Sequence, residues 1–227
     1  MSTKIVDNLI YEVGSHAAFL IGYDFDAVDN IPDIITVPPH IDGTFVTGVA
    51  KRAFAFKPIK NIRLPNSISI IEQDAFMQSK IEGVEFYTTP VPLQVTLDVA
   101  SMAFYQCDNL KRFVAQQFVN AEYLSFAMCP KLKNFGTTYI TDFLSVHERA
   151  FDKSGVEVIY LANNGRLRTN ALSNSSVKEI HLKDAARIPA KTMEYIRKRG
   201  IKLCVYPFSP LLDLIHDGYW VEEDAPF

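Results

Sequence analysis

The 227-residue sequence predicts a repeat solenoid, of α/β to mainly β class, with about seven coils and a parallel strand face. Two observations predict it: a small-large dipeptide, usually Ala-Phe, that recurs every 21 to 28 residues, and an apolar six-residue block that follows each copy. We assign residues 49–206 to the solenoid and residues 1–48 to an N-terminal β cap. Residues 207–227 form a C-terminal tail, which either caps the last coil or docks on another chain. Caps are expected because an end coil would otherwise expose its core to water.

The first repeated element pairs a small residue with a large apolar one. Its copies are Ala53-Phe54, Ala75-Phe76, Ala103-Phe104, Ser125-Phe126, Ala150-Phe151, Ala171-Leu172 and Thr192-Met193. A single unit of this kind cannot bury its own apolar face, so neighbouring units must stack and share a core. We therefore expect the phenylalanines to form a column inside the stack, at about the strand spacing of 4.8 Å.

The second repeated element is a block with apolar residues at its first, fourth and sixth places. The blocks are IKNIRL (59–64), IEGVEF (81–86), LKRFVA (110–115), LKNFGT (132–137), VEVIYL (156–161), VKEIHL (177–182) and IKLCVY (201–206). Alternation over the last three places is the period of a β-strand, in which successive side chains point to opposite faces. These blocks predict the parallel strand face, and the segments before each Ala-Phe close the other side of the coil.

The two ends of the chain depart from this frame. Residues 5–13 and 18–24 each predict a strand, and residues 26–33 predict a turn. Near the other end, a basic cluster falls on a short helix that we expect to end at Gly200. The cluster contains Lys191, Arg197, Lys198, Arg199 and Lys202. A solvated helix face is favoured there over a phosphate site, because no aromatic platform accompanies the charges.

The repeats closely resemble the BspA-like branch of the leucine-rich repeats. The best match is RLPNSISIIEQDAFMQSKIEGVEF (63–86), and Cys107 and Cys129 supply the cysteine of the family pattern in the next two units. The resemblance covers about residues 17–206. It implies a leucine-rich-repeat solenoid that recognises proteins, frequently in adhesion at cell surfaces.

Composition excludes several classes of protein. Twenty-three basic against 26 acidic residues give a net charge of −3, so no nucleic-acid partner is predicted. No run approaches the roughly 18 apolar residues of a membrane helix, so no membrane insertion is expected. The opening MSTKIVDNLIYEVGSH does not read as a signal peptide. We expect a cytoplasmic location, or one within a particle assembled in the cytoplasm, and surface display only if a leader was removed.

Neither catalytic nor cofactor-binding nor metal-ligating residues are predicted. The sequence contains no P-loop, GxGxxG, GxSxG or HExxH motif, no CxxC pair, and its five histidines are scattered. An enzyme is therefore not expected. The frame places Cys107 and Cys129 in adjacent coils, where a disulfide is sterically conceivable, but free buried thiols are favoured.

The candidate partner-binding residues lie in three places. On the strand face, the frame aligns Arg63, Glu85, Val114, Tyr160, His181 and Val205 in one outward row. Two residues earlier it aligns Arg112, Val158, Glu179 and Leu203. From these rows we select Arg112, Val114, Val158, Tyr160 and His181. The other two places are an inserted loop with Pro90, Val91, Pro92 and Leu93, and the tail with Tyr219 and Trp220. The alternatives are an ordinary half-buried sheet face and a loop that packs back over the coil edge.

Two hypotheses about function follow. The first is a non-catalytic scaffold that binds a protein partner, or mediates adhesion, through its extended repeat surface. The second is a structural subunit of a large assembly, such as a viral or phage particle, docked through the loop and tail. Self-association belongs to either hypothesis, and the partner itself is not identified.

Overall fold

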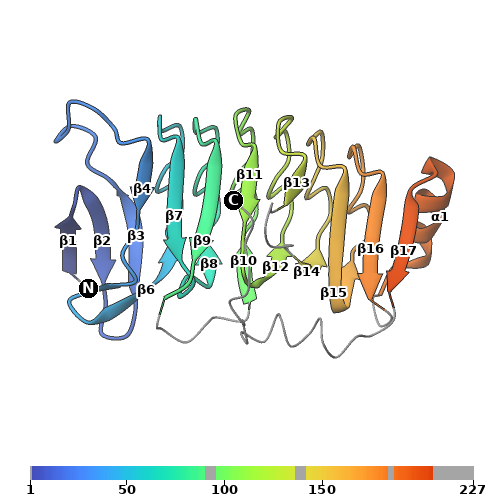
Figure 1. Ribbon diagram of the computed structural model, residues 1–227, viewed down its shortest axis with the longest axis horizontal. Helices are drawn as coiled ribbons and strands as arrows, with labels where there is room; N and C mark the ends of the chain where they lie inside the picture. Colours follow the sequence, from blue (N-terminus) through green and yellow to red (C-terminus); the bar gives the residue numbers. More distant parts are fainter. Residues whose placement is uncertain (1, 90–95, 136–141, 184–186, 207–227) are drawn as a thin grey trace, which may run out of the picture.

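The computed structural model describes residues 2–89, 96–135, 142–183 and 187–206, and shows a stack of coils with strands side by side along its length (Figure 1). The fold is a β-solenoid of about six turns with parallel strands, which confirms the predicted class. Within the described residues, one sheet has five strands in the order β13-β11-β9-β7-β4. These strands are β4 (Ile34–Thr36), β7 (Asn61–Pro65), β9 (Gly83–Tyr87), β11 (Arg112–Val114) and β13 (Asn134–Phe135).

The second sheet of the described residues is longer and has twelve strands. It begins with β1 (Ser2–Val6), β2 (Leu9–Val13), β3 (Ala18–Tyr23) and β6 (Thr44–Val49), with β5 (His40–Ile41) paired to β6. It continues through β8 (Ile70–Ile71), β10 (Thr96–Val99), β12 (Phe118–Ala121), β14 (Asp142–Val146), β15 (Val158–Leu167), β16 (Glu179–Lys183) and β17 (Lys202–Tyr206). The segments before each Ala-Phe are thus parallel strands too, a regularity that our sequence interpretation left undefined.

From β6 to β13, the Ala-Phe dipeptide or its Ser-Phe equivalent lies in the turn that joins a strand of the longer sheet to a strand of the five-stranded sheet. In the first six copies the residue before the small residue is left-handed, as at Asp74 (φ 58°), and so is the second residue after the large one, as at Gln78 (φ 54°). Because this conformation is unfavourable for residues with a side chain, something must hold it in place. Backbone hydrogen bonds between neighbouring turns do so: the Phe76 amide donates to the Ala103 carbonyl (2.8 Å) and the Gln78 amide to the Tyr105 carbonyl (2.9 Å).

The phenylalanines stack as a column through the core, as predicted. Ring centroids of successive members lie 5.2, 4.9, 5.3 and 6.0 Å apart, for Phe54, Phe76, Phe104, Phe126 and Phe151 in order. All five side chains are fully buried. The spacing follows the strand spacing, so each ring fills one layer of the stack.

The two buried cysteines are free thiols that donate hydrogen bonds to backbone carbonyls of the turns. Cys107 donates to the Phe76 carbonyl and Cys129 to the Phe104 carbonyl, each at 3.0 Å. Ser154 and Ser175 occupy the same place in later coils and donate to the carbonyls of Phe151 and Leu172. Burial raises the pKa of the Cys129 thiol well above its ordinary value. These side chains therefore act as hydrogen-bond donors inside the turn.

The N-terminal strands correct one prediction. Residues 5–13 do not form one strand, because Asp7 and Asn8 are both left-handed (φ 49° and 63°) and turn the chain between β1 and β2. The two strands pair antiparallel, β2 pairs antiparallel with β3, and β3 then joins β6 in parallel. The strand predicted at 18–24 corresponds to β3, and residues 26–33 contain neither helix nor strand. The assignment of 1–48 as a separate cap stays a prediction.

The C-terminal unit differs from the others. Thr192 and Met193 lie in the helix α1 (Ala190–Arg199) instead of in a turn, so the seventh unit has a strand but no Ala-Phe corner. The helix ends as predicted at Gly200, which is left-handed (φ 64°) and donates its amide to the Arg197 carbonyl. In Figure 1 α1 lies beside β17 at one end of the stack. Residues 207–227, including the two assigned tail residues, lie outside the described part.

Candidate protein-binding face

The strand row consists of the strands formed by the second repeated block: β7, β9, β11 and β13, followed by the first part of β15, then β16 and β17 (Figure 1). Its outer face aligns side chains from successive coils. Asn61 of β7 is paired with Gly83 of β9, and Gly83 with Arg112 of β11. Further along, Val158 of β15 is paired with Glu179 of β16, and Tyr160 with His181. Since paired residues of parallel strands point to the same side, these groups share one surface. The lateral rows of the described strands β7 to β16 follow the predicted frame.

The side chains of the outer rows are not equally exposed to solvent. Arg112 is exposed and its guanidinium lies 3.1 Å from the Glu85 carboxylate. Val158, Tyr160 and His181 are half-buried. Val114 was expected to face outward, but only 6% of its surface is exposed. Its pairing with Glu85 keeps Val114 in the outer row, but neighbouring atoms cover it and leave little surface for a partner.

A hollow lies at the glycine in this row. Gly83 has no side chain, and the surrounding residues leave a space of about 180 Å³. Its lining includes Ile34, which is 54% exposed, together with Asn61, Arg63, Glu85 and Arg112. The hollow therefore combines one exposed aliphatic side chain with charged groups of both signs.

The register of the last strand corrects a second prediction. We aligned Val205 with His181 and Leu203 with Glu179. In the structure His181 is paired with Cys204 and Glu179 with Lys202, one residue earlier than predicted. A shift of one residue exchanges the two faces of a strand. Cys204 therefore belongs to the outer row, whereas Leu203 is paired with the buried Ile180.

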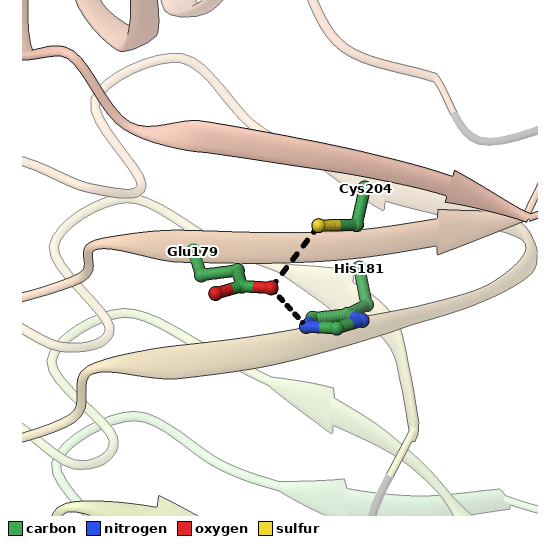
Figure 2. Close-up of side chains that lie close together, drawn as sticks. All are labelled: Glu179, His181 and Cys204. Atoms are coloured by element: carbon green, nitrogen blue, oxygen red, sulfur yellow. Dashed lines mark hydrogen bonds and ion pairs between the residues drawn. The ribbon is translucent and has the colours of Figure 1, made fainter.

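This register brings Glu179, His181 and Cys204 together on β16 and β17, as Figure 2 shows. Oε1 of Glu179 lies 2.8 Å from Nε2 of His181 and accepts a hydrogen bond from Sγ of Cys204 at 3.0 Å. Nζ of Lys202 donates to the same oxygen at 3.2 Å. The hydrogen bonds from Cys204 and Lys202 lower the pKa of Glu179, and the contact with Glu179 raises the pKa of the Cys204 thiol.

Sequence reasoning missed this cluster for an identifiable reason. Glu179 and His181 are two residues apart on a predicted strand, so their shared face was foreseeable. Cys204 could be added only with the correct register, and the preceding helix delays that strand relative to the other units. In the described residues, these three side chains are the one group of His, Cys, Asp and Glu whose potential ligand atoms cluster.

A second group that the sequence did not indicate lies around the last residues of β15. The backbones of Arg166 and Arg187 form an isolated parallel β-bridge. Together with Arg168, Ile188 and Pro189, these two residues line a depression of about 500 Å³. All three arginines are exposed. The depression is wide and shallow, so we assign it no ligand.

The remaining candidate residues cannot be placed. Pro90, Val91, Pro92 and Leu93 of the inserted loop, and Tyr219 and Trp220 of the tail, lie outside the described residues. In the part of the chain that is described, no helix is both long and apolar enough to cross a membrane.

Comparison with known proteins agrees with the architecture. No curated protein matches the sequence. A leucine-rich repeat protein from T. pallidum has a similar structure, with a TM-score of 0.55 and 17% identity, over 90% of this chain and 100% of that one. A leucine-rich repeat protein from Bacteroides capillosus is 18% identical over 71% of this chain and 99% of that one, with a TM-score of 0.43. At these identities the likeness to the T. pallidum protein shows a shared fold.

The family is established by the sequence. The model of the BspA type leucine rich repeat region matches residues 47–178 in six copies, which is more than half of the chain. The matched range contains the six turns that carry the Phe column and its continuation at Leu172. The chain belongs to the BspA type leucine-rich repeat family.

Proposed function

We propose that this chain is a non-catalytic scaffold that binds a protein partner on the outer face of its strand row. The family and fold support a repeat scaffold suited to protein interaction. Repeat proteins bind partners on the extended surface that their stacked units create. The proposed binding face carries Arg112, Val158, Tyr160 and His181.

This face is chosen because it combines a hollow with an exposed arginine and an aromatic side chain, as protein interfaces do. At one end, Ile34 and Arg112 border the hollow above Gly83. At the other, the Tyr160 ring stacks on the His181 ring, with centroids 4.4 Å apart and planes tilted by 30°. Protein interfaces are enriched in aromatic residues and arginine, which provide a large contact area with directional polar atoms.

The experiment compares charge-altering variants on and off this face. Arg112→Glu and Tyr160→Asp change the proposed surface. Tyr123→Asp is the matched control, because Tyr123 is 39% exposed but lies in a turn away from the face. Partners enriched by the full-length chain from native extract would be identified by mass spectrometry, and the main partner purified for binding titrations.

We expect Tyr160→Asp and Arg112→Glu each to weaken partner binding by roughly 30-fold, the effect of losing an interface hot spot. Tyr123→Asp should bind as the wild type does. Circular dichroism melts of all three variants would show that the solenoid stays folded. Equal binding by all variants, or an equal loss in Tyr123→Asp, would contradict the proposed face.

A further inference from the structure

The cluster of Glu179, His181 and Cys204 has the composition of a metal site. It provides a carboxylate, an imidazole and a thiol, whose potential ligand atoms all lie within 4.8 Å of one another. Sulfur and imidazole ligands favour borderline-soft ions such as Zn²⁺ over Mg²⁺ and Ca²⁺, which take oxygen ligands. The chemistry of the three groups therefore points to a divalent transition metal.

The three side chains are positioned by paired backbone and by packing. Residues 179–183 of β16 pair in parallel with residues 202–206 of β17, which fixes the separation of Cys204 from His181. The Tyr160 ring covers one face of the imidazole. All three side chains are half-buried, and the buried Ile180 lies between Glu179 and His181 in the strand. Such partial burial lowers local hydration without closing the site to an ion.

We propose that Glu179, His181 and Cys204 bind Zn²⁺ with three protein ligands. A tetrahedral ion with Zn–S of about 2.3 Å and Zn–N of about 2.0 Å separates its ligand atoms by roughly 3.3–3.6 Å. The present contacts of 2.8 and 3.0 Å are hydrogen-bonding distances. Side-chain rotations that move the ligand atoms by about half an ångström would open the space. The fourth position would face solvent and hold water.

Binding exchanges a proton for the ion. In the metal-free cluster the Cys204 thiol donates its proton to the Glu179 carboxylate. When Zn²⁺ binds, the sulfur releases that proton to the buffer and its electron pair forms the bond to the metal. The carboxylate oxygen that had accepted the hydrogen bond becomes free to coordinate the ion. No oxidant or reductant is needed.

Lys202 is the cation that competes with the metal. Its ammonium group lies 3.2 Å from Oε1 of Glu179, but the side chain is 68% exposed and can turn into solvent. In the preceding coil the carboxylate of Glu157, just before β15, is paired with Lys178. Replacing Lys202 by Met should therefore tighten metal binding, because it removes a positive charge and a competing hydrogen bond.

The test uses the reduced, metal-free full chain and Co²⁺ as a spectroscopic probe, since Co²⁺ bound to a thiolate gives a strong near-ultraviolet charge-transfer absorption. We expect one equivalent to bind with this absorption and to be displaced by Zn²⁺. Cys204→Ser should abolish the absorption. His181→Gln should weaken binding by at least tenfold, since even outer-shell partners of metal ligands contribute about 10–100-fold. His147→Gln, a histidine in a turn outside the cluster, should change neither.

A second readout does not depend on the variants folding. In the wild-type chain, Zn²⁺ should slow the alkylation of Cys204, followed by peptide mass spectrometry, while the buried Cys107 and Cys129 react slowly with or without metal. The proposal is overturned if no thiolate absorption appears, if it persists in Cys204→Ser, or if Zn²⁺ leaves the alkylation of Cys204 unchanged. None of these outcomes depends on the proposed partner-binding function.

Discussion

The coils of the Phe column and the C-terminal end of the solenoid are built by different rules. From Phe54 to Phe151 the same residue fills the same place, and the rings stack at nearly constant spacing. Beyond that point Leu172 replaces the phenylalanine, α1 replaces the turn, and a carboxylate, an imidazole and a thiol cluster on the outer face. Strict repetition stabilises the core, whereas the proposed metal ligands come together where the repetition weakens.

The two regions also differ in how the charged side chains on their outer faces are paired. In the earlier coils, charged residues pair one to one between neighbours, as Lys111 does with Glu82 and Arg112 with Glu85. At the C-terminal end a single carboxylate, that of Glu179, is shared by His181, Lys202 and Cys204. This sharing of one carboxylate is the arrangement on which the proposed metal site is based.

The largest expected effect is on the column itself. Phe104→Ala should lower the free energy of unfolding by about 3–5 kcal/mol, because the side chain is fully buried and contacts rings in both adjacent coils. Leu172→Ala, at the end of the column, should cost less, and its effect should be confined to the last coils. Chemical denaturation followed by circular dichroism measures both. Equal losses would show that the two regions form one uniform core.

The next largest effect concerns close backbone approach. A methyl group at Gly155 would overlap the Pro130 carbonyl oxygen, which is backbone and cannot rotate away. Gly155→Ala should therefore destabilise the chain by about 1–3 kcal/mol, as overpacking does. The matched control is Gly43→Ala, at a hairpin glycine with open space around it, where the cost is that of its positive φ alone. The prediction fails if Gly155→Ala melts at the wild-type temperature.

A smaller effect is expected at Tyr11, near the N-terminal end. Its hydroxyl is buried without a hydrogen-bond partner among the described residues, and burial raises its pKa above the ordinary value. Tyr11→Phe should be neutral or stabilising by up to about 1 kcal/mol near pH 7. A raised pKa means that the folded wild type holds its proton more tightly than the unfolded chain, so its stability falls as pH rises above about 10. Denaturant titrations at several pH values across this range should show that the free energy of unfolding falls less steeply with pH in Tyr11→Phe than in the wild type. An equal fall in both proteins would contradict the prediction.

The smallest effect is expected for ion pairs between coils. Lys111 and Glu82 are solvent-exposed, and their attraction is offset by hydration and lost side-chain freedom. Lys111→Ala should leave the denaturation midpoint within the fitting error, with any difference disappearing in high salt. A clear loss of stability in Lys111→Ala would mean that charge pairs, and not the Phe column, hold these coils together.

The sequence was sufficient for the solenoid because each signal was repeated. The Ala-Phe frame located the column and the strand face, and glycine at position 200 located the end of α1. The sequence was insufficient where a feature that occurs only once sets the end of a strand or its register. The Asp7-Asn8 turn divides a run that looks like one strand, and the helix shifts β17 by one residue against β16. Neither event recurs, so no second copy could reveal it.

The candidate site was predictable only in part for the same reason. The frame placed Tyr160 beside His181 and Val158 beside Glu179. It did not show that Val114 is covered, because burial depends on neighbours outside the repeat. Nor did it bring Cys204 to Glu179, since that contact depends on the register of one strand.

The central claim, that a partner binds the outer face of the strand row, is tested most directly by site-specific photo-crosslinking. A photoreactive phenylalanine would replace Tyr160 in one sample of the full chain and Tyr123 in another, each incubated with the enriched partner. We predict a partner adduct from position 160, suppressed by excess unlabelled chain, and little adduct from position 123. An adduct from position 123 alone, or equal adducts from both positions, would contradict the account.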